Sequence, residues 1–160
     1  MGGIEDLNKD ITIIIVNITI FTQNYYSIWY DYDNFLLNDD TILTFRSADE
    51  AQDYCIHKFN EKTDIWNLNF DDAIISDCSL FLDKWNVVGD IAKTLNLDFI
   101  GNRKEFTNLY SKFVYGSNLP TMNNTGIEYI PSFDEEEKQQ IENVTKDMIR
   151  ILKLALEIDD

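Results

Sequence analysis

A run of β-branched residues from Ile11 to Phe21 constrains the fold more than any other feature of this sequence. Isoleucine or valine occupies most positions of both parities, which is typical of a strand that is covered on both faces. The run is interrupted by Asn17 and Thr19, and it is shorter than the ~20 residues needed to cross a bilayer. We therefore expect a buried strand near the N-terminus, and neither a membrane helix nor an export signal.

Two further segments predict strands after this run. Tyr25 to Phe35 alternates aromatic and polar residues, as a strand with one wet face does. Asn38, Asp39 and Asp40 then supply turn residues before a second short strand, Thr41 to Phe45. Together with the first run, these segments predict a small N-terminal antiparallel sheet of about three strands.

The rest of the chain has mainly helical periodicity. Ser47 and Glu50 form a capping box at the start of the first predicted helix, and Ser132 and Glu135 repeat that spacing before the last one. Gly89 marks a possible break within the second helical segment. The predicted helical segments are 47–60, 73–95, 104–115 and a long C-terminal one, with connections at 61–72 and 116–131. Apolar residues at helical spacing predict the buried faces of the first and last segments: Ala51, Tyr54, Cys55 and Phe59 in the first, and Ile141, Val144, Met148, Ile151, Leu152 and Ala155 in the last. We expect an α+β fold with four or five packed helices after the sheet, in a single domain over residues 1–160.

The balance of charge is strongly acidic. The 160 residues include 29 Asp and Glu against 13 Lys and Arg, a net charge of −16. Such a surface repels phosphates and anionic lipids, so we expect no direct binding of nucleic acid or membrane. The acidic charge has two interpretations: it attracts a basic protein partner, or it serves solubility alone. The first is the more specific one.

Residues that could carry catalysis are few. His57 is the only histidine, and Asp53 precedes it by four residues, so a small hydrolase using this pair stays an alternative. The chain has no P-loop, GxGxxG or GxSxG sequence, and its paired acids lack the EF-hand pattern. We read Cys55 and Cys78 as buried apolar residues. We therefore expect no catalytic residue, no cofactor and no metal ion.

Acidic residues next to aromatic ones are the best candidates for partner binding. Carboxylates beside aromatic anchors can meet arginine or lysine side chains of a basic cleft. One group lies on the second predicted strand and its turn, and the other lies near Trp66 and Phe70. The predicted partner-binding residues are Trp29, Asp31, Asp33, Asp39 and Asp40 in the first group, and Asp71, Asp72 and Asp77 in the second.

Three stretches carry a resemblance to a known family. They are WYDYDNFLLNDDTILTFRSADEAQDYC, LFLDKWNVVGDIAKTLNLDFIG and LYSKFVYGSNLPTM, at 29–55, 80–101 and 109–122. Read together, they resemble the immunity proteins of bacterial contact-dependent growth inhibition systems. The resemblance implies a cytoplasmic antidote that binds a cognate basic toxin domain, often a nuclease, and occludes its active site or substrate-binding surface.

A different kind of binding protein has the same electrostatic properties. A phage-type inhibitor that mimics nucleic acid, and so blocks a host enzyme, is the alternative to an immunity protein. The two differ in their gene neighbourhood, because an immunity gene lies next to its toxin gene. The sequence leaves open which toxin is bound, whether its active site is covered, and the oligomeric state.

Overall fold

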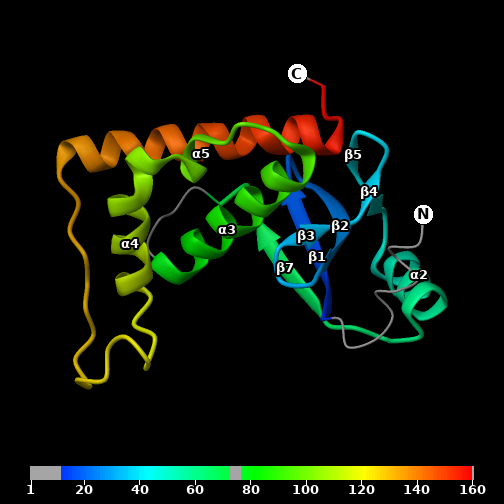
Figure 1. Cartoon of the computed structure of the whole chain (residues 1–160), viewed down its shortest axis with the longest axis horizontal. Coiled ribbons are helices and arrows are strands. Elements are labelled where there is room, and N and C mark those ends of the chain that lie inside the picture. Colours follow the sequence, from blue (N-terminus) through cyan, green and yellow to red (C-terminus); the bar gives the residue numbers. More distant parts are fainter. Residues whose placement is uncertain (1–11, 73–76, 160) are drawn as a thin grey trace. The chain divides into compact units, whose positions relative to one another are not determined.

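The computed structural model describes residues 12–72 and 77–159 (Figure 1). Within these residues the chain forms two compact units. The N-terminal unit contains the described residues up to Asp72 together with Ala155–Glu157, and the second contains Asp77 to Leu154 with Ile158 and Asp159. The α+β class is confirmed, with four α-helices among the described residues. The prediction of one domain over residues 1–160 stays a prediction.

The N-terminal unit is built on a mixed sheet (Figure 1). Its strands run in the order β3-β2-β1-β7, β6 also pairs with β2, and β4 and β5 form a separate two-stranded ribbon. The prediction of about three antiparallel strands is therefore wrong. The strands are β1 (Ile13–Ile20), β2 (Gln23–Tyr30), β3 (Asn34–Phe35), β4 (Leu37–Asn38), β5 (Thr41–Ile42), β6 (Thr44–Phe45) and β7 (Ile65–Asn69).

Strand β1 matches the β-branched run. Ile15, Val16, Ile18 and Ile20 have no exposed side-chain surface, so both parities of the strand are buried, as predicted. Ile11, the first residue of the predicted strand, lies outside the described residues. On one face, Ile13 and Ile15 belong to a cluster that also contains Ala51, Cys55 and Phe59 of α2 (Ala48–Phe59). This helix therefore covers part of the sheet with its predicted apolar stripe.

The strand that sequence patterns missed is β7. It lies in the segment expected to be a connection, and it pairs in parallel with β1, so that Asn17 lies opposite Asn67. Nδ2 of Asn17 donates to Oδ1 of Asn67 at 3.0 Å and to Oδ1 of Asn24 at 3.3 Å. The amide that interrupts the apolar run thus links three neighbouring strands. A parallel neighbour requires a crossover connection, and α2 lies within it.

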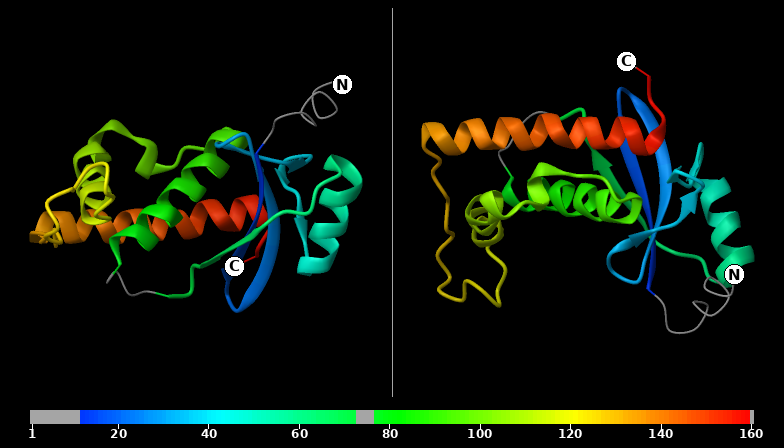
Figure 2. Two further views of the ribbon diagram at one scale, coloured as in Figure 1. Left: turned by 90° about the horizontal axis from the view of Figure 1, so that it is seen from below. Right: turned by 45° about the horizontal axis from the view of Figure 1, so that its top comes forward.

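Among its described residues, the second unit contains three α-helices, the last of which ends in residues assigned to the N-terminal unit (Figure 2). They are α3 (Cys78–Leu95), α4 (Thr107–Gly116) and α5 (Glu135–Leu156), with two short 3-10 turns at Ile100–Asn102 and Lys104–Phe106. Helix α3 continues through Gly89, so the break that the sequence suggested there is absent. The glycine instead leaves room for Asn102, whose Oδ1 would lie 2.8 Å from a Cβ atom at this position. Residues 73–76, the start of the predicted helical segment, lie outside the described residues.

Aromatic side chains form much of the core of the second unit. Phe81 and Trp85 of α3 pack against Phe113 of α4, with ring centroids 4.7 and 6.1 Å from it. Nε1 of Trp85 donates to the carbonyl oxygen of Gly101 at 3.0 Å, so the indole is satisfied while it is buried. The predicted buried face of α5 is also confirmed, with Ile141, Val144, Met148, Ile151, Leu152 and Ala155 buried.

Two capping boxes were predicted, and one of them is displaced. At α2, Oγ of Ser47 accepts from the backbone N–H of Glu50, as expected. At α5, the box is formed by Asp134 and Glu137, two residues later than predicted. A carboxylate caps a helix as well as a hydroxyl does, so the spacing alone did not decide between the two sites.

Candidate partner-binding surfaces

Trp29, Asp31 and Asp33 lie together at the turn between β2 and β3. Asp31 and Tyr32 have φ of 53° and 73°, and the backbone N–H of Asp31 donates to the carbonyl oxygen of Thr12 at 3.0 Å. The ring of Trp29 lies edge-on to that of Tyr32, with centroids 6.0 Å apart. Both carboxylates are exposed. The predicted strand over 25–35 is therefore wrong, because this turn divides it into β2 and β3 and carries Asp31 and Asp33. The turn presents two acids next to an aromatic pair, and its role in partner binding stays a prediction.

Asp39 and Asp40 form the turn of the β4–β5 ribbon. Asn38 pairs with Thr41 across the turn, and Asp39 has the left-handed φ of 56° that such a two-residue connection favours. Both acids are exposed. The predicted turn is confirmed, and it lies on a different hairpin from Asp31 and Asp33.

The carboxylate of Asp71 accepts hydrogen bonds from the turn between β1 and β2. Its Oδ1 accepts from the N–H of Phe21 at 2.7 Å and its Oδ2 from the N–H of Thr22 at 2.8 Å. Phe21 and Thr22 form the two-residue turn between β1 and β2, with φ of 51° and 61°. This geometry normally selects asparagine or glycine, and a β-branched residue in it is an outlier. The carboxylate thus stabilises a strained turn.

Asp72 and Asp77, the other two residues of the second predicted group, belong to different units. Asp72 is exposed and ends the described part of the N-terminal unit. Asp77 belongs to the second unit, where its Oδ1 accepts from the N–H groups of Ser79 and Leu80 at 3.0 and 3.2 Å. Asp77 is therefore the N-cap of α3, a structural role that also fits its residue type.

Asp31 and Asp71, one from each predicted group, lie at opposite ends of β1 within the N-terminal unit. In the β1–β2 pairing Ile13 faces Tyr30 and Ile20 faces Gln23, so the Asp31 turn and the Phe21 turn are separated by the whole of β1. This length is roughly 23 Å at about 3.3 Å per residue. Within the N-terminal unit, the Asp31 turn and Asp71 therefore do not belong to one compact acidic patch.

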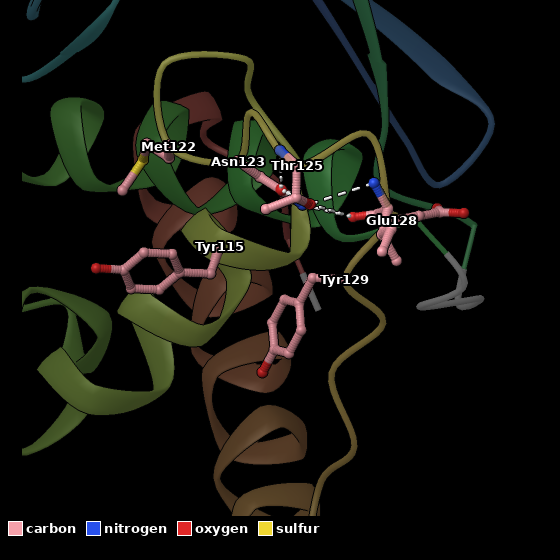
Figure 3. A pocket seen from close by; sticks show the side chains of 7 residues that line it. Tyr115, Met122, Asn123, Thr125, Glu128 and Tyr129 are labelled. Carbon is pink, nitrogen blue, oxygen red and sulfur yellow. Dashed lines mark hydrogen bonds between the residues drawn. The ribbon is translucent and has the colours of Figure 1, made fainter.

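A surface that sequence patterns missed lies on the connection between α4 and α5 (Figure 3). Five large apolar or aromatic side chains on this segment, together with Tyr115 in the last turn of α4, are between 42% and 76% exposed. We call them the apolar loop surface: Tyr115, Leu119, Met122, Ile127, Tyr129 and Ile130. In Figures 1 and 2 the segment, drawn in yellow, extends away from the helices of its unit. Exposed apolar groups of this density mark interaction surfaces.

Two asparagines hold this loop in one conformation. Oδ1 of Asn118 accepts from the N–H of Tyr129 at 2.7 Å, and its Nδ2 donates to the carbonyl oxygen of the same residue at 2.9 Å. Nδ2 of Asn123 donates to Oδ1 of Asn118 at 2.8 Å and to the carbonyl oxygen of Ile127 at 2.9 Å. These bonds satisfy backbone groups that an irregular segment leaves open. The exposed side chains therefore stand on a braced backbone.

The far end of the loop is fixed by Phe133. Its ring stacks on Phe113 with centroids 5.2 Å apart, and Nζ of Lys112 lies 5.2 Å from its centroid. Lys112 also donates to Oε2 of Glu137 at 2.9 Å. The backbone N–H of Asp134 and the ammonium of Lys112 together hold the pKa of Glu137 below its ordinary value. The loop is thus anchored to α4 and α5 where it ends.

The His57 ring contacts the backbone of Asp53. Nδ1 of His57 lies 2.7 Å from the backbone carbonyl oxygen of Asp53, so the i−4 spacing brings the ring to the helix backbone. The ring is exposed on α2.

The thiol of Cys55, on the same helix, is buried. Burial raises its pKa to about 11, so the thiol is protonated at neutral pH.

Neither a group of metal ligands nor a membrane-spanning helix occurs among the described residues. In residues 12–72 and 77–159, no three or more His, Cys, Asp or Glu side chains are grouped so that they could hold a metal ion. Within the same residues, no helix combines the length and the apolar character that crossing a bilayer requires.

Comparisons with known proteins give no match. Neither protein-family models, nor curated protein sequences, nor solved structures match this chain. The resemblance to immunity proteins therefore stays a prediction.

Proposed function

We propose that this chain is an immunity protein that binds a cognate toxin domain, a nuclease, and neutralises it by covering its basic active-site or substrate-binding surface. The proposal combines the resemblance of residues 29–55, 80–101 and 109–122 with the charge of the chain and the apolar loop surface. It requires binding and no chemistry by the chain itself.

The single observation that carries the proposal is the apolar loop surface. Ile127 and Ile130 are each 76% exposed, and their neighbour Tyr129 is bonded through both backbone groups to Asn118. Leaving large apolar side chains in water is unfavourable, and bracing them there costs conformational entropy as well. Such an arrangement is typical of a surface that becomes buried in a complex, where rigid aromatic and apolar anchors supply most of the affinity.

The charge of the chain favours a basic partner. A nuclease must hold phosphates, so its cleft is positively charged, and a chain of net charge −16 is attracted to it over several ångströms. Asp31, Asp33, Asp39 and Asp40 are exposed on two turns of the N-terminal unit, where they can contact lysine or arginine. In this proposal the acids accelerate association and the apolar loop surface slows dissociation.

Co-expression tests the proposal directly. The chain is produced together with the C-terminal domain of the protein encoded by the neighbouring upstream gene, and growth and complex formation are measured. We expect a stoichiometric complex on a sizing column and the rescue of growth. Toxicity that is unchanged in the presence of the chain, with no complex at low salt, would contradict the proposal.

Point variants then locate the interface. Ile130→Asp places a charge on the apolar loop surface and is expected to weaken the complex by at least tenfold, since anchor residues contribute about 2 kcal/mol or more. Ile56→Asp is the matched control, because Ile56 is 43% exposed on α2 and the change in net charge is the same. Equal weakening by both variants would indicate a general effect of charge instead of a contact.

A further inference from the structure

A preformed hollow lies within the apolar loop surface (Figure 3). It has a volume of about 420 Å³, within the range of ligand sites, and it is open to solvent. Figure 3 shows the rings of Tyr115 and Tyr129 on the same side of the loop, with Met122 near Tyr115. Its lining residues are Tyr115, Met122, Asn123, Thr125, Ile127, Glu128 and Tyr129.

The two tyrosines are positioned by different elements. Tyr115 lies in the last turn of α4, where its carbonyl oxygen accepts from the N–H of Asn118 at 3.1 Å. Tyr129 is held through its backbone by the side chain of Asn118, at 2.7 and 2.9 Å. A single asparagine thus holds the backbone at both tyrosines. A site that is ordered before binding loses less entropy when it is filled.

The chemistry of the lining selects a cationic side chain with an apolar stem. Two aromatic faces attract a cation, and a thioether packs against methylene groups. The only charged side chain of the lining is the carboxylate of Glu128, and no basic residue belongs to it. In Figure 3 this carboxylate points away from the rings, so it acts through its field and not by contact.

Arginine fits this hollow better than lysine or a second copy of the chain. A guanidinium is planar, stacks on aromatic rings and is more weakly hydrated than an ammonium. A second copy would bring another net charge of −16 to the same surface, and the two would repel each other. We infer that the hollow between Tyr115, Met122 and Tyr129 receives an arginine side chain of the basic partner protein, an inference that rests on the proposed function.

A small-molecule titration tests the inference without the partner. The probe is N-acetyl-arginine amide, and its neutral, nearly isosteric counterpart is N-acetyl-citrulline amide. The methyl group of Met122 is observed by NMR, with Met148, which is 2% exposed, as the internal reference. We expect saturable shifts of Met122 and stationary Met148. The arginine probe should bind roughly two- to fivefold more tightly than citrulline, and the difference should shrink as salt rises.

Tyr129→Leu removes the aromatic face but keeps an apolar side chain of similar reach. It is expected to abolish the preference for arginine over citrulline. Tyr25→Leu, a control at a partly exposed tyrosine of β2 to which no binding role is assigned, should leave the preference unchanged. Equal binding of the two probes, a Met122 signal that does not move, or a preference that survives Tyr129→Leu would each overturn the inference. If the chain binds the toxin but does not prefer the arginine probe to the citrulline probe, this inference alone is overturned. If the chain prefers the arginine probe but binds no toxin, the proposed partner is overturned.

Discussion

At the scale of single residues, the strained turn between β1 and β2 is held by a carboxylate that lies about 50 residues further along the chain. Phe21 and Thr22 adopt left-handed φ angles that neither residue type favours. Asp71 contacts both N–H groups from the end of β7, and its own N–H donates to Oδ1 of Asn69 at 2.8 Å. The sequence singled out Asp71 as a partner-binding residue, but these bonds give its carboxylate a structural role.

Asp71→Ala tests that role. Hydrogen bonds from a carboxylate to two backbone groups are lost, so we expect the free energy of unfolding to fall by roughly 1–3 kcal/mol. Asp40→Ala, which removes an exposed turn carboxylate, should change it by less than about 0.5 kcal/mol. Urea denaturation of the three proteins makes the comparison. Equal stability of the wild type and Asp71→Ala would show that water replaces the carboxylate without loss.

Thr22→Gly should have the opposite effect. Glycine adopts φ near 61° without steric cost, so relief of the strained backbone is expected to stabilise the fold by about 1 kcal/mol, or about 2–4 °C in Tm. Thr41→Gly in β5 is the control, because glycine weakens a residue with ordinary strand geometry. Thermal denaturation followed by circular dichroism distinguishes the two. A decrease in Tm for both variants would contradict the assignment of strain at Thr22.

At the scale of elements, the connection between α4 and α5 depends on side chains instead of a backbone ladder. Asn118 bonds to Gly116, Asn123 and Tyr129, and it has a φ of 54° itself. Asn118→Ala should therefore release the loop while the helices stay folded. We expect faster amide hydrogen exchange at Tyr129, measured by NMR, with little change in the core of α3.

Asn124→Ala is the matched control for this loop, since Asn124 is exposed two residues from Met122. It should leave the exchange rate at Tyr129 close to the wild-type value. If both variants accelerate exchange equally, the bracing by Asn118 is not the cause of order in the loop.

The start of α5 makes stability dependent on pH. The pKa of Glu137 is lowered in the folded state, first by the backbone N–H of Asp134 and then by Lys112. Its contribution is therefore present above the pKa of an unfolded glutamate, near 4.3, and is lost as pH falls through the lower folded value. Glu137→Gln should reduce stability by about 0.5–1 kcal/mol at pH 7, since the ion pair is partly exposed.

The difference between wild type and Glu137→Gln should shrink as pH falls below the pKa of an unfolded glutamate, and it should vanish once the glutamate is protonated in the folded state as well. Thermal denaturation at pH 7 and pH 3 measures it. Glu136→Gln, a change at the exposed neighbouring residue, should show little difference at either pH. A deficit of Glu137→Gln that persists unchanged at the lower pH would point to packing and not to charge.

At the scale of the whole molecule, the net charge of −16 governs how a basic partner is approached. Ions shorten the range of this attraction to about 8 Å at physiological ionic strength. In the proposed complex we therefore expect the association rate constant to fall by about tenfold or more between low and high salt, with a smaller change in the dissociation rate. Ile130→Asp should instead raise the dissociation rate.

Stopped-flow association and surface-based dissociation measurements separate the two effects. An association rate that is independent of salt would remove the role assigned to the acids. A dissociation rate unaffected by Ile130→Asp would remove the role assigned to the apolar loop surface.

The sequence by itself determined the features that depend on local periodicity and capping. The β-branched run predicted β1 with both faces buried, Ser47 predicted the start of α2, and the apolar spacing after residue 134 predicted the buried face of α5. Each of these follows from neighbours within a few residues, where strand and helix geometry fix which side chains share a face. The displaced cap at Asp134 shows the limit of such rules, because several polar residues near a helix start can accept the same N–H groups.

Only the tertiary structure decided the rest, because it depends on contacts between distant segments. Strand β7 is short and half polar, and it exists as a strand because Asn67 pairs with Asn17, 50 residues earlier. The same return of the chain brings Asp71 to the Phe21 turn. The apolar loop surface has no periodicity to detect, since its order comes from Asn118 reaching Tyr129 across 11 residues. Local propensity cannot encode such pairings, which form only when the folded chain brings these groups together.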